Sequence, residues 1–502
     1  MGDPEPEPVS RQRGGTSQPE RGFARSVLTL VSGTALAQLL LVLAVPVLAR
    51  LYTPADYGVL AVYSATLSVL VVLGSLRYEA AITLPEDDET ASALLALCIL
   101  ILIVMAGAVS LLLWFAGDRF VTLLNVPGLR PYLWLIPFGL TGAGLYQALS
   151  HWTIRRGAFT RLARTKLSQG IGQVVAQVGL GAAGVGAPGL LIGDLVGRVA
   201  GAGGLGVTAL RDRPAGSLTL ARLRAAASRY RRFPLLTTWA GLLNQGSLQL
   251  PSMFFSAAFG VAAAGLYALS YKMMVLPTML VASAVGQVFL SRAAVAAREP
   301  EQLAKLTERT AVALFAAGLP AFGLIALAGP QLFAAVMGSR WEQSGQYAQI
   351  LAPWFALWLV SNPLSGLLSV REWQGSALAF TTLEFTLRLG ALLIGESHNS
   401  PRLAVALLSA SGVVIASASI VRFMLAGYSS AGRLLGPAAR LLGLAAGCLL
   451  PGAAALYAGS RFLAMVTAAL GTVVYYVLVS RSVVPLHGIR FGMDPSDTEA
   501  TP

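Results

Sequence analysis

The chain has 502 residues, of which 55% are hydrophobic and only 12% are charged. A water-soluble domain usually carries about 25% charged residues, so this composition excludes an ordinary soluble protein and predicts one that sits in a lipid bilayer. The formal net charge of +13 would suggest nucleic acid as a partner of a soluble protein. Here the basic residues lie mainly in loops, and we expect membrane lipids with anionic headgroups and an anionic substrate instead, with no nucleic acid.

The first 25 residues are rich in Pro, Glu, Gly and Arg and lack apolar periodicity. This composition is typical of a disordered tail. No short apolar stretch with a small-residue cleavage site follows, so we expect a retained helix and not a cleaved signal peptide.

Apolar stretches of membrane length follow one another along the rest of the chain. A hydrocarbon core about 30 Å thick needs roughly 20 apolar residues of helix. By this rule we predict an all-α, polytopic membrane protein with about fourteen transmembrane helices. The predicted spans are residues 26–48, 57–84, 91–115, 131–150, 167–185, 189–210, 235–258, 263–290, 310–329, 348–370, 377–395, 402–425, 437–458 and 462–480.

These spans divide into two lobes of six helices and a final pair. We predict an N-lobe over residues 26–210, a C-lobe over 235–425, two further helices over 437–480 and a C-terminal tail over 481–502. If the N-terminus is cytoplasmic, 26 of the 36 Lys and Arg residues lie in cytoplasmic segments and only six lie in outer loops. The bias of basic residues toward cytoplasmic loops then predicts that both termini are cytoplasmic.

A faint internal repeat supports the division into lobes. RLYTPADYG (50–58), before the second span, corresponds to AAFGVAAAG (257–265), before the eighth, so that Gly58 matches Gly265. Six spans separate the two segments, an even number, so both enter the membrane in the same direction. Two bundles related by an axis along the membrane normal are expected, as in one class of transporter.

Ionisable side chains inside the predicted spans are the main candidates for function, because charge at membrane depth is costly and usually faces a bundle interior or a wet cavity. Asp194 and Arg198, like Glu384 and Arg388, stand four residues apart and can pair on one helix. Arg77 and Glu79 stand two apart, so on a helix they point to different faces. We predict a basic cavity and separate ion-coupling positions, with these members: Arg77, Arg198, Lys272 and Arg388 for the cavity, and Glu79, Asp194 and Glu384 for coupling.

Each of these residues also has a purely structural interpretation. An acid–base pair can neutralise itself and join two helices, and Arg77 can reach the lipid headgroups. Side-chain amides form a second set that lines a hydrophilic passage or hydrogen-bonds between helices. The set contains Gln38, Gln147, Gln173, Gln177, Asn244, Gln245, Gln249 and Gln287.

Features of an enzyme are not apparent. The acidic segment PEDDET (85–90) is expected to be a solvated loop or helix N-cap, and the three histidines are scattered over loops. Cys98 and Cys448 lie in apolar runs without neighbours at ligand spacing, so we expect neither a disulfide nor a metal site. No catalytic residue, cofactor or nucleotide-binding motif is predicted.

The segments LARLYTPADYG (48–58) and RYEAAITLPEDDETA (77–91) resemble the Wzx-type polysaccharide flippases of the MOP superfamily. Further similar stretches are SRYRRFP (228–234), GLYALSYKMMVLP (265–277) and QVF (287–289), so that the resemblance covers about residues 26–425. It implies two six-helix lobes arranged as a V with a cationic central cavity. It also implies a flippase that moves undecaprenyl-pyrophosphate-linked oligosaccharide across the bacterial inner membrane by alternating access.

Such a flippase would serve surface polysaccharide biosynthesis, including that of lipopolysaccharide and O-antigen, beside a polysaccharide polymerase and a chain-length regulator. Three other functions stay open. A MATE-like antiporter of small molecules or ions belongs to the same superfamily. A glycan polymerase or ligase would need a large catalytic outer loop, and a scaffold protein would leave the charges inside the spans unexplained.

Overall fold

The computed structural model describes residues 17–211, 219–371 and 377–482, and within them it contains helices and no strand. The all-α prediction is therefore confirmed for this part of the chain. Its N-lobe consists of α1 (Ser17–Leu51), α2 (Pro54–Gly74), α3 (Asp88–Leu123), α4 (Leu135–Arg155), α5 (Phe159–Ala182) and α6 (Ala187–Arg211). Its C-lobe consists of α8 (Thr238–Phe259), α9 (Val261–Ala296), α10 (Pro300–Met337), α11 (Glu342–Leu364), α13 (Ala377–Ser397) and α14 (Pro401–Ala426).

The remaining elements are a final helix pair and several short turns. The pair is α15 (Gly432–Tyr457) and α16 (Arg461–Ser482), which pack on each other and on α10. The short elements are α7 (Leu220–Arg229), α12 (Leu367–Val370) and the turns η1 (Tyr78–Ala81), η2 (Pro127–Tyr132), η3 (Phe233–Thr237) and η4 (Ser339–Trp341). Among the described residues, nine helices are long and apolar enough to cross a membrane by length and composition. The count of fourteen spans stays a prediction.

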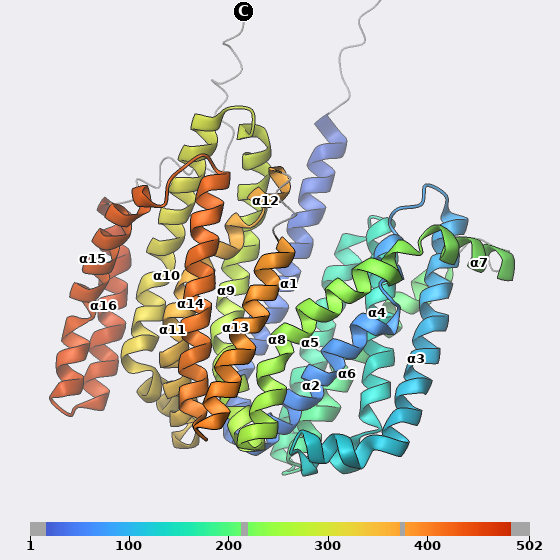
Figure 1. The fold of residues 1–502 in the computed structure, drawn as a ribbon, viewed down its shortest axis with the longest axis horizontal. Coiled ribbons are helices and arrows are strands. Elements are labelled where there is room, and N and C mark those ends of the chain that lie inside the picture. Colours follow the sequence, from blue (N-terminus) through green and yellow to red (C-terminus); the bar gives the residue numbers. More distant parts are fainter. Residues whose placement is uncertain (1–16, 212–218, 372–376, 483–502) are drawn as a thin grey trace, which may run out of the picture.

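Two groups of helices stand side by side with α1 between them (Figure 1). They approach each other at the lower end of this view, where α2 begins, and diverge toward the upper end, where α7 and α12 lie. α2 is the main link between the lobes, because it packs on both α8 and α9. We call the end where α2 begins the outer end, since the charge bias predicts that it faces the periplasm.

Three of the five hydrophobic clusters of the described residues illustrate this arrangement. The largest contains residues of both lobes, such as Val45 and Leu48 of α1 together with Phe255 of α8 and Tyr267 of α9. A second cluster is drawn from the N-lobe and α7, and a third from the C-lobe and the start of α15. The apolar core is therefore continuous between the lobes near the outer end and divided elsewhere.

Two predicted boundaries differ from the structure. α1 begins at Ser17, within the segment predicted as a disordered tail, since a helix can continue beyond the hydrocarbon; residues 1–16 and 483–502 lie outside the described part. The second span was predicted to reach residue 84, but α2 ends at Gly74 and a turn follows. The apolar Ala81 and Ile82 after that turn are buried by protein in the N-lobe core, which is why hydropathy alone extends the helix too far.

The acidic segment after η1 caps a helix, as the sequence predicts. The Asp87 carboxylate accepts a hydrogen bond from the backbone N–H of Thr90 at 2.6 Å and caps α3. This bond stabilises the charged form and lowers the pKa of Asp87 below its usual value. Asp88 pairs with Arg155 and Arg156, at 3.1 and 2.9 Å, so the segment also joins α3 to α4.

We predict that Asp87→Ala lowers the free energy of unfolding by about 1 kcal/mol, the usual loss when an N-cap is removed. Heat unfolding of the detergent-solubilised chain measures this loss, with Asp87→Asn as the control that keeps a capping oxygen. Because the folded pKa is depressed, the contribution of the charge is present above the unfolded pKa and is lost as the pH falls through the folded pKa. A loss that is the same for Ala and Asn would contradict the capping role.

Candidate functional site

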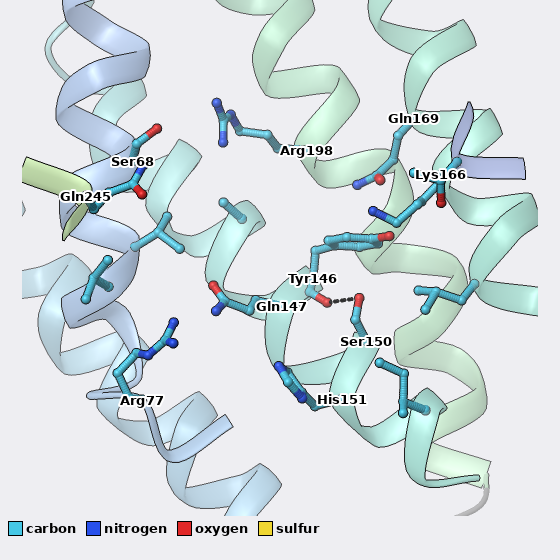
Figure 2. A pocket seen from close by; sticks show the side chains of 16 residues that line it. Ser68, Arg77, Tyr146, Gln147, Ser150, His151, Lys166, Gln169, Arg198 and Gln245 are labelled. Carbon is cyan, nitrogen blue, oxygen red and sulfur yellow. Dashed lines mark hydrogen bonds between the residues drawn. The ribbon is translucent and has the colours of Figure 1, made fainter. Parts of the chain in front are cut away.

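A basic cavity of about 720 Å³ lies inside the N-lobe (Figure 2). Its walls come from α1, α2, α4, α5 and α6, and one residue of α8 in the C-lobe completes them. Its polar lining residues are Thr34, Ser68, Arg77, Tyr146, Gln147, Ser150, His151, Lys166, Gln169, Arg198 and Gln245. The lining of this cavity holds four basic side chains and no carboxylate.

A smaller cavity of about 240 Å³ adjoins the first. The two share the lining residues Thr34, Lys166, Gln169 and Arg198. The smaller one adds Gln38 from α1, Gln173 from α5 and Asp194 from α6. We call the two together the N-lobe cavity; its walls combine basic groups with several side-chain amides.

The Arg77 side of the cavity is built by the turn that ends α2. Leu76 and Arg77 have positive φ angles of 50° and 64°, so the chain leaves the helix before Glu79. The Arg77 guanidinium then lies 3.6 Å from the Glu79 carboxylate, while Arg77 itself points into the cavity (Figure 2). The expectation that these two side chains point to different faces is wrong, because helical spacing does not apply to a left-handed turn.

Glu79 lies behind the cavity wall and is only 1% exposed. Its carboxylate accepts hydrogen bonds from the hydroxyl of Ser75 and, at 2.9 Å, from the amide of Gln147 on α4. A buried carboxylate is tolerated when it is paired and hydrogen-bonded, and here these contacts hold the turn against α4. Gln147 therefore both lines the cavity and positions Glu79.

Arg198 and Asp194 form the ion pair that their spacing on α6 predicts. The Nε atom of Arg198 lies 2.5 Å from a carboxylate oxygen of Asp194, and the Arg198 side chain is 25% exposed. Arg198 lines both parts of the N-lobe cavity, so the pairing does not remove it from the passage. The guanidinium retains donors that can bind another anion.

Two basic residues of the cavity, His151 and Lys166, are absent from the predicted site. The predicted spans 131–150 and 167–185 leave both residues in the connecting loop, whereas they lie on α4 and α5. α5 begins at Phe159, eight residues before the predicted span, so Lys166 lies in its second turn and faces the cavity. The basic composition of the loop was a usable signal, but only for the orientation of the chain.

The two predicted basic residues of the C-lobe are not among the residues that line the N-lobe cavity. Arg388 is buried in an ion pair with Glu384, donates to Ser247 at 3.3 Å and lies over the ring of Trp354. The two charges therefore neutralise each other, as the structural interpretation of this pair expects. Lys272 is half-buried on α9.

The predicted side-chain amides fall into those that line the cavity and those that do not. Gln38, Gln147, Gln173 and Gln245 line the cavity. Gln177 is buried and donates to the carbonyl of Leu190, which joins α5 to α6 as the helix-contact interpretation expects. Asn244, Gln249 and Gln287 are not among the lining residues.

Among the described residues, no group of three or more His, Cys, Asp or Glu side chains is arranged to hold a metal ion.

Comparison with known proteins places these features in a family. The model of the family described as "Polysaccharide biosynthesis protein" matches residues 47–346. The chain is 28% identical over 323 residues to the succinoglycan biosynthesis transport protein ExoT of Rhizobium meliloti, and the match spans 61% of each protein. Less than two thirds of that relative is therefore covered.

Solved structures show the same fold at low sequence identity. The lipid II flippase MurJ in an inward closed conformation superposes with a TM-score of 0.69 and 10% identity, covering 92% of this chain and 99% of MurJ. An inward-facing multidrug resistance MATE transporter of the MOP superfamily gives a TM-score of 0.57 and 14% identity, covering 77% and 94%. The predicted MOP-like architecture is confirmed. At such low sequence identities, the similarity shows a shared fold and nothing about function.

We predict that Glu79→Leu lowers the free energy of unfolding by about 2–3 kcal/mol, because Arg77, Ser75 and Gln147 lose the buried charged group to which they bind. Heat unfolding in detergent measures the loss. Glu301→Leu is the matched control, since it breaks an exposed pair with Lys305, and exposed ion pairs contribute little to stability. Equal losses in the two variants would show that the Glu79 network does not hold the turn.

Proposed function

Because the chain belongs to the polysaccharide biosynthesis protein family, we propose that it moves a lipid-linked oligosaccharide from the cytoplasmic to the periplasmic leaflet of the bacterial inner membrane. The proposed substrate carries undecaprenyl pyrophosphate, and the proposed mechanism is alternating access. The observation that carries this proposal is that Arg77, Lys166 and Arg198 line one cavity together with His151, with amides beside them and no carboxylate in the larger part.

The chemistry of the cavity suits the two parts of such a headgroup. A pyrophosphate and hydrated sugars cannot cross hydrocarbon without polar partners. Arg77 and Arg198 offer planar guanidinium groups that bind phosphate oxygens in pairs, whereas Lys166 offers a point charge. The side-chain amides both donate and accept hydrogen bonds, as sugar hydroxyls require. The lipid chain can stay in the bilayer beside the bundle.

The position of the cavity supports loading from the cytoplasm. Arg77 follows the end of α2, and His151 lies near the end of α4, so both are far from the outer end where α2 begins. The continuous apolar core lies near that outer end. With both termini cytoplasmic, as the charge bias predicts, the cavity is reached from the side on which lipid-linked precursors are assembled.

An ion gradient or removal of the product would drive the cycle, because the sequence contains no nucleotide-binding motif. Glu79, Asp194 and Glu384 are the proposed coupling positions, and each is paired with an arginine in this state. Protonation or ion binding at one of them would release its arginine. Polymerase and chain-length regulator partners belong to the same proposal.

A small-molecule antiporter is the second function to consider, because the MATE fold is shared. A cationic drug would be repelled by Arg77, Lys166 and Arg198 together, so the cavity favours an anionic substrate. A polymerase or ligase would need a catalytic segment outside the membrane, and the described outer loops are short turns between helices.

We predict that Arg198→Gln reduces export by about tenfold or more, because hydrogen bonds to charged groups contribute about 1.5–3 kcal/mol each. The measurement is the amount of lipid-linked oligosaccharide that accumulates on the cytoplasmic side of a deletion strain carrying the variant. Arg119→Gln, exposed at the outer end of α3, is the control and should export normally. Normal export by Arg198→Gln would remove Arg198 from the substrate path.

Glu384→Gln tests the coupling proposal. If Glu384 carries the coupling ion, transport by this variant loses its dependence on an imposed pH or Na⁺ gradient, because the neutral amide can neither take up a proton nor bind a cation strongly. Transport into vesicles is followed with each gradient imposed separately. A dependence unchanged from that of the original chain on both gradients would assign coupling to another position.

A further inference from the structure

The basic residues of the N-lobe cavity differ in whether a nearby carboxylate balances their charge. Arg77 lies 3.6 Å from Glu79, and Arg198 lies 2.5 Å from Asp194, so each arginine already has a carboxylate within its own segment. The Lys166 ammonium makes no hydrogen bond or ion pair with any described residue. Lys166 is therefore the lysine or arginine side chain of the cavity lining that has no carboxylate partner among the described residues.

Lys166 also occupies the junction of the two parts of the cavity, since it lines both. In Figure 2 it lies on the wall opposite Arg77, beside Gln169, and Arg198 approaches from a third direction. The three side chains come from α5, from the turn after α2, and from α6. An anion in the larger cavity is thus surrounded by positive groups on three sides.

An unbalanced charge in a low-dielectric setting interacts most strongly with an incoming ion of opposite sign. An anion that binds near Arg77 or Arg198 must share each guanidinium with a carboxylate, whereas an anion beside Lys166 meets no such competitor.

We propose that Lys166 is the residue that selects a phosphate-bearing lipid over a neutral one, with the paired arginines orienting the same phosphates. This inference rests on the proposed function and names the specificity-determining contact within it.

The experiment measures binding of undecaprenyl pyrophosphate and of the neutral alcohol undecaprenol to the full chain in lipid nanodiscs. For Lys166→Gln we expect the affinity for the pyrophosphate to fall by about tenfold or more, as for loss of a charged hydrogen bond, and the affinity for undecaprenol to be unchanged. Lys166→Arg should restore most of the preference. Arg164→Gln is the matched control, because Arg164 lies on the same helix and is exposed.

Two outcomes would overturn the inference, and they differ. If Lys166→Gln keeps the full preference for pyrophosphate while Arg77→Gln or Arg198→Gln loses it, the arginines select the substrate and Lys166 does not. If the unmodified chain shows no preference for the pyrophosphate over the alcohol, the proposed function itself fails. Retention of the folded state is checked by gel filtration of each variant.

A second inference comes from the outer end, where α2 and α9 cross in backbone contact. A Cβ atom built on Gly58 would lie 1.8 Å from the carbonyl oxygen of Val261, and one built on Gly265 would lie 1.8 Å from the carbonyl oxygen of Pro54. No side chain fits at either place without moving the helices apart. These are the two glycines that the internal repeat makes equivalent, so the lobes meet at corresponding positions.

Other interlobe contacts gather around this crossing. The Trp341 indole N–H, in η4 of the C-lobe, donates to the Ala49 carbonyl of α1 at 2.7 Å, and the Trp341 ring packs edge-on against Tyr57. The hydroxyl of Ser256 on α8 donates to the carbonyl of Leu124 at 2.6 Å. Each bond is buried and uses a main-chain acceptor, so opening the lobes here breaks bonds that the separated surfaces must satisfy with water.

The geometry assigns the Gly58–Gly265 crossing as the outer closure of the passage. The absence of two side chains lets the helices approach to backbone contact, which seals this end while the cavity at the other end of α2 is accessible. Any side chain at either position favours the state in which the outer end is open.

Labelling of a buried reporter tests this assignment. Ala264 is fully buried at the crossing, and Ala264→Cys is introduced with Cys98→Ala and Cys448→Ala, so that it is the single thiol. We expect a membrane-impermeant maleimide added outside the cell to label it several-fold faster when Gly58→Ala or Trp341→Phe is also present. Gly246→Ala is the matched control, because a Cβ there meets no atom within 4 Å, and it should leave labelling slow.

The Trp341→Phe variant keeps an aromatic ring but removes the N–H donor together with the five-membered part of the indole, so it weakens the closure without touching Gly58 and tests it even if Gly58→Ala prevents folding. Labelling that is equally slow in the folded Gly58→Ala and Trp341→Phe variants would overturn the assignment. Equally fast labelling in the Gly246→Ala control would overturn it as well, because the effect would then not depend on the crossing.

Discussion

The contact on which the structure depends is the crossing of α2 and α9 at Gly58 and Gly265. Two helices can approach to backbone distance only where both lack a side chain, and in a membrane such close packing is a principal source of association between helices. α2 belongs to the N-lobe but packs on α8 and α9, so the position of the whole N-lobe relative to the C-lobe follows from this contact. The largest hydrophobic cluster surrounds it and contains residues of both lobes.

The polar residues of the candidate site lie at the opposite end of α2. There the chain turns sharply at Leu76 and Arg77, and the turn presents Arg77 to the cavity while it buries Glu79 against Gln147. One helix therefore connects the apolar closure with the basic cavity. The alternating access that we propose would require both ends of this helix to change their contacts.

The predicted charges proved to be of two kinds. Asp194 with Arg198 and Glu384 with Arg388 have the same spacing in the sequence, and both form ion pairs on one helix. The first pair lines a cavity, whereas the second is enclosed by Ser247 and Trp354. Spacing along a helix decides that two residues can pair, but the neighbouring helices decide whether water or another side chain fills the remaining space.

The sequence by itself determined the all-helical membrane fold, because hydropathy and span length are properties of consecutive residues. The division into lobes and the equivalence of Gly58 and Gly265 were predicted from the spacing of the spans and from the local repeat. The sequence also predicted that Arg77 and Arg198 belong to a polar passage, since charged side chains at membrane depth are costly and usually face a bundle interior or a wet cavity. Only the tertiary structure decided that Lys166 and His151 join them while Lys272 and Arg388 do not line that cavity. A cavity wall is assembled from five or more helices, and the faces that they turn toward one another depend on packing between segments far apart in the chain.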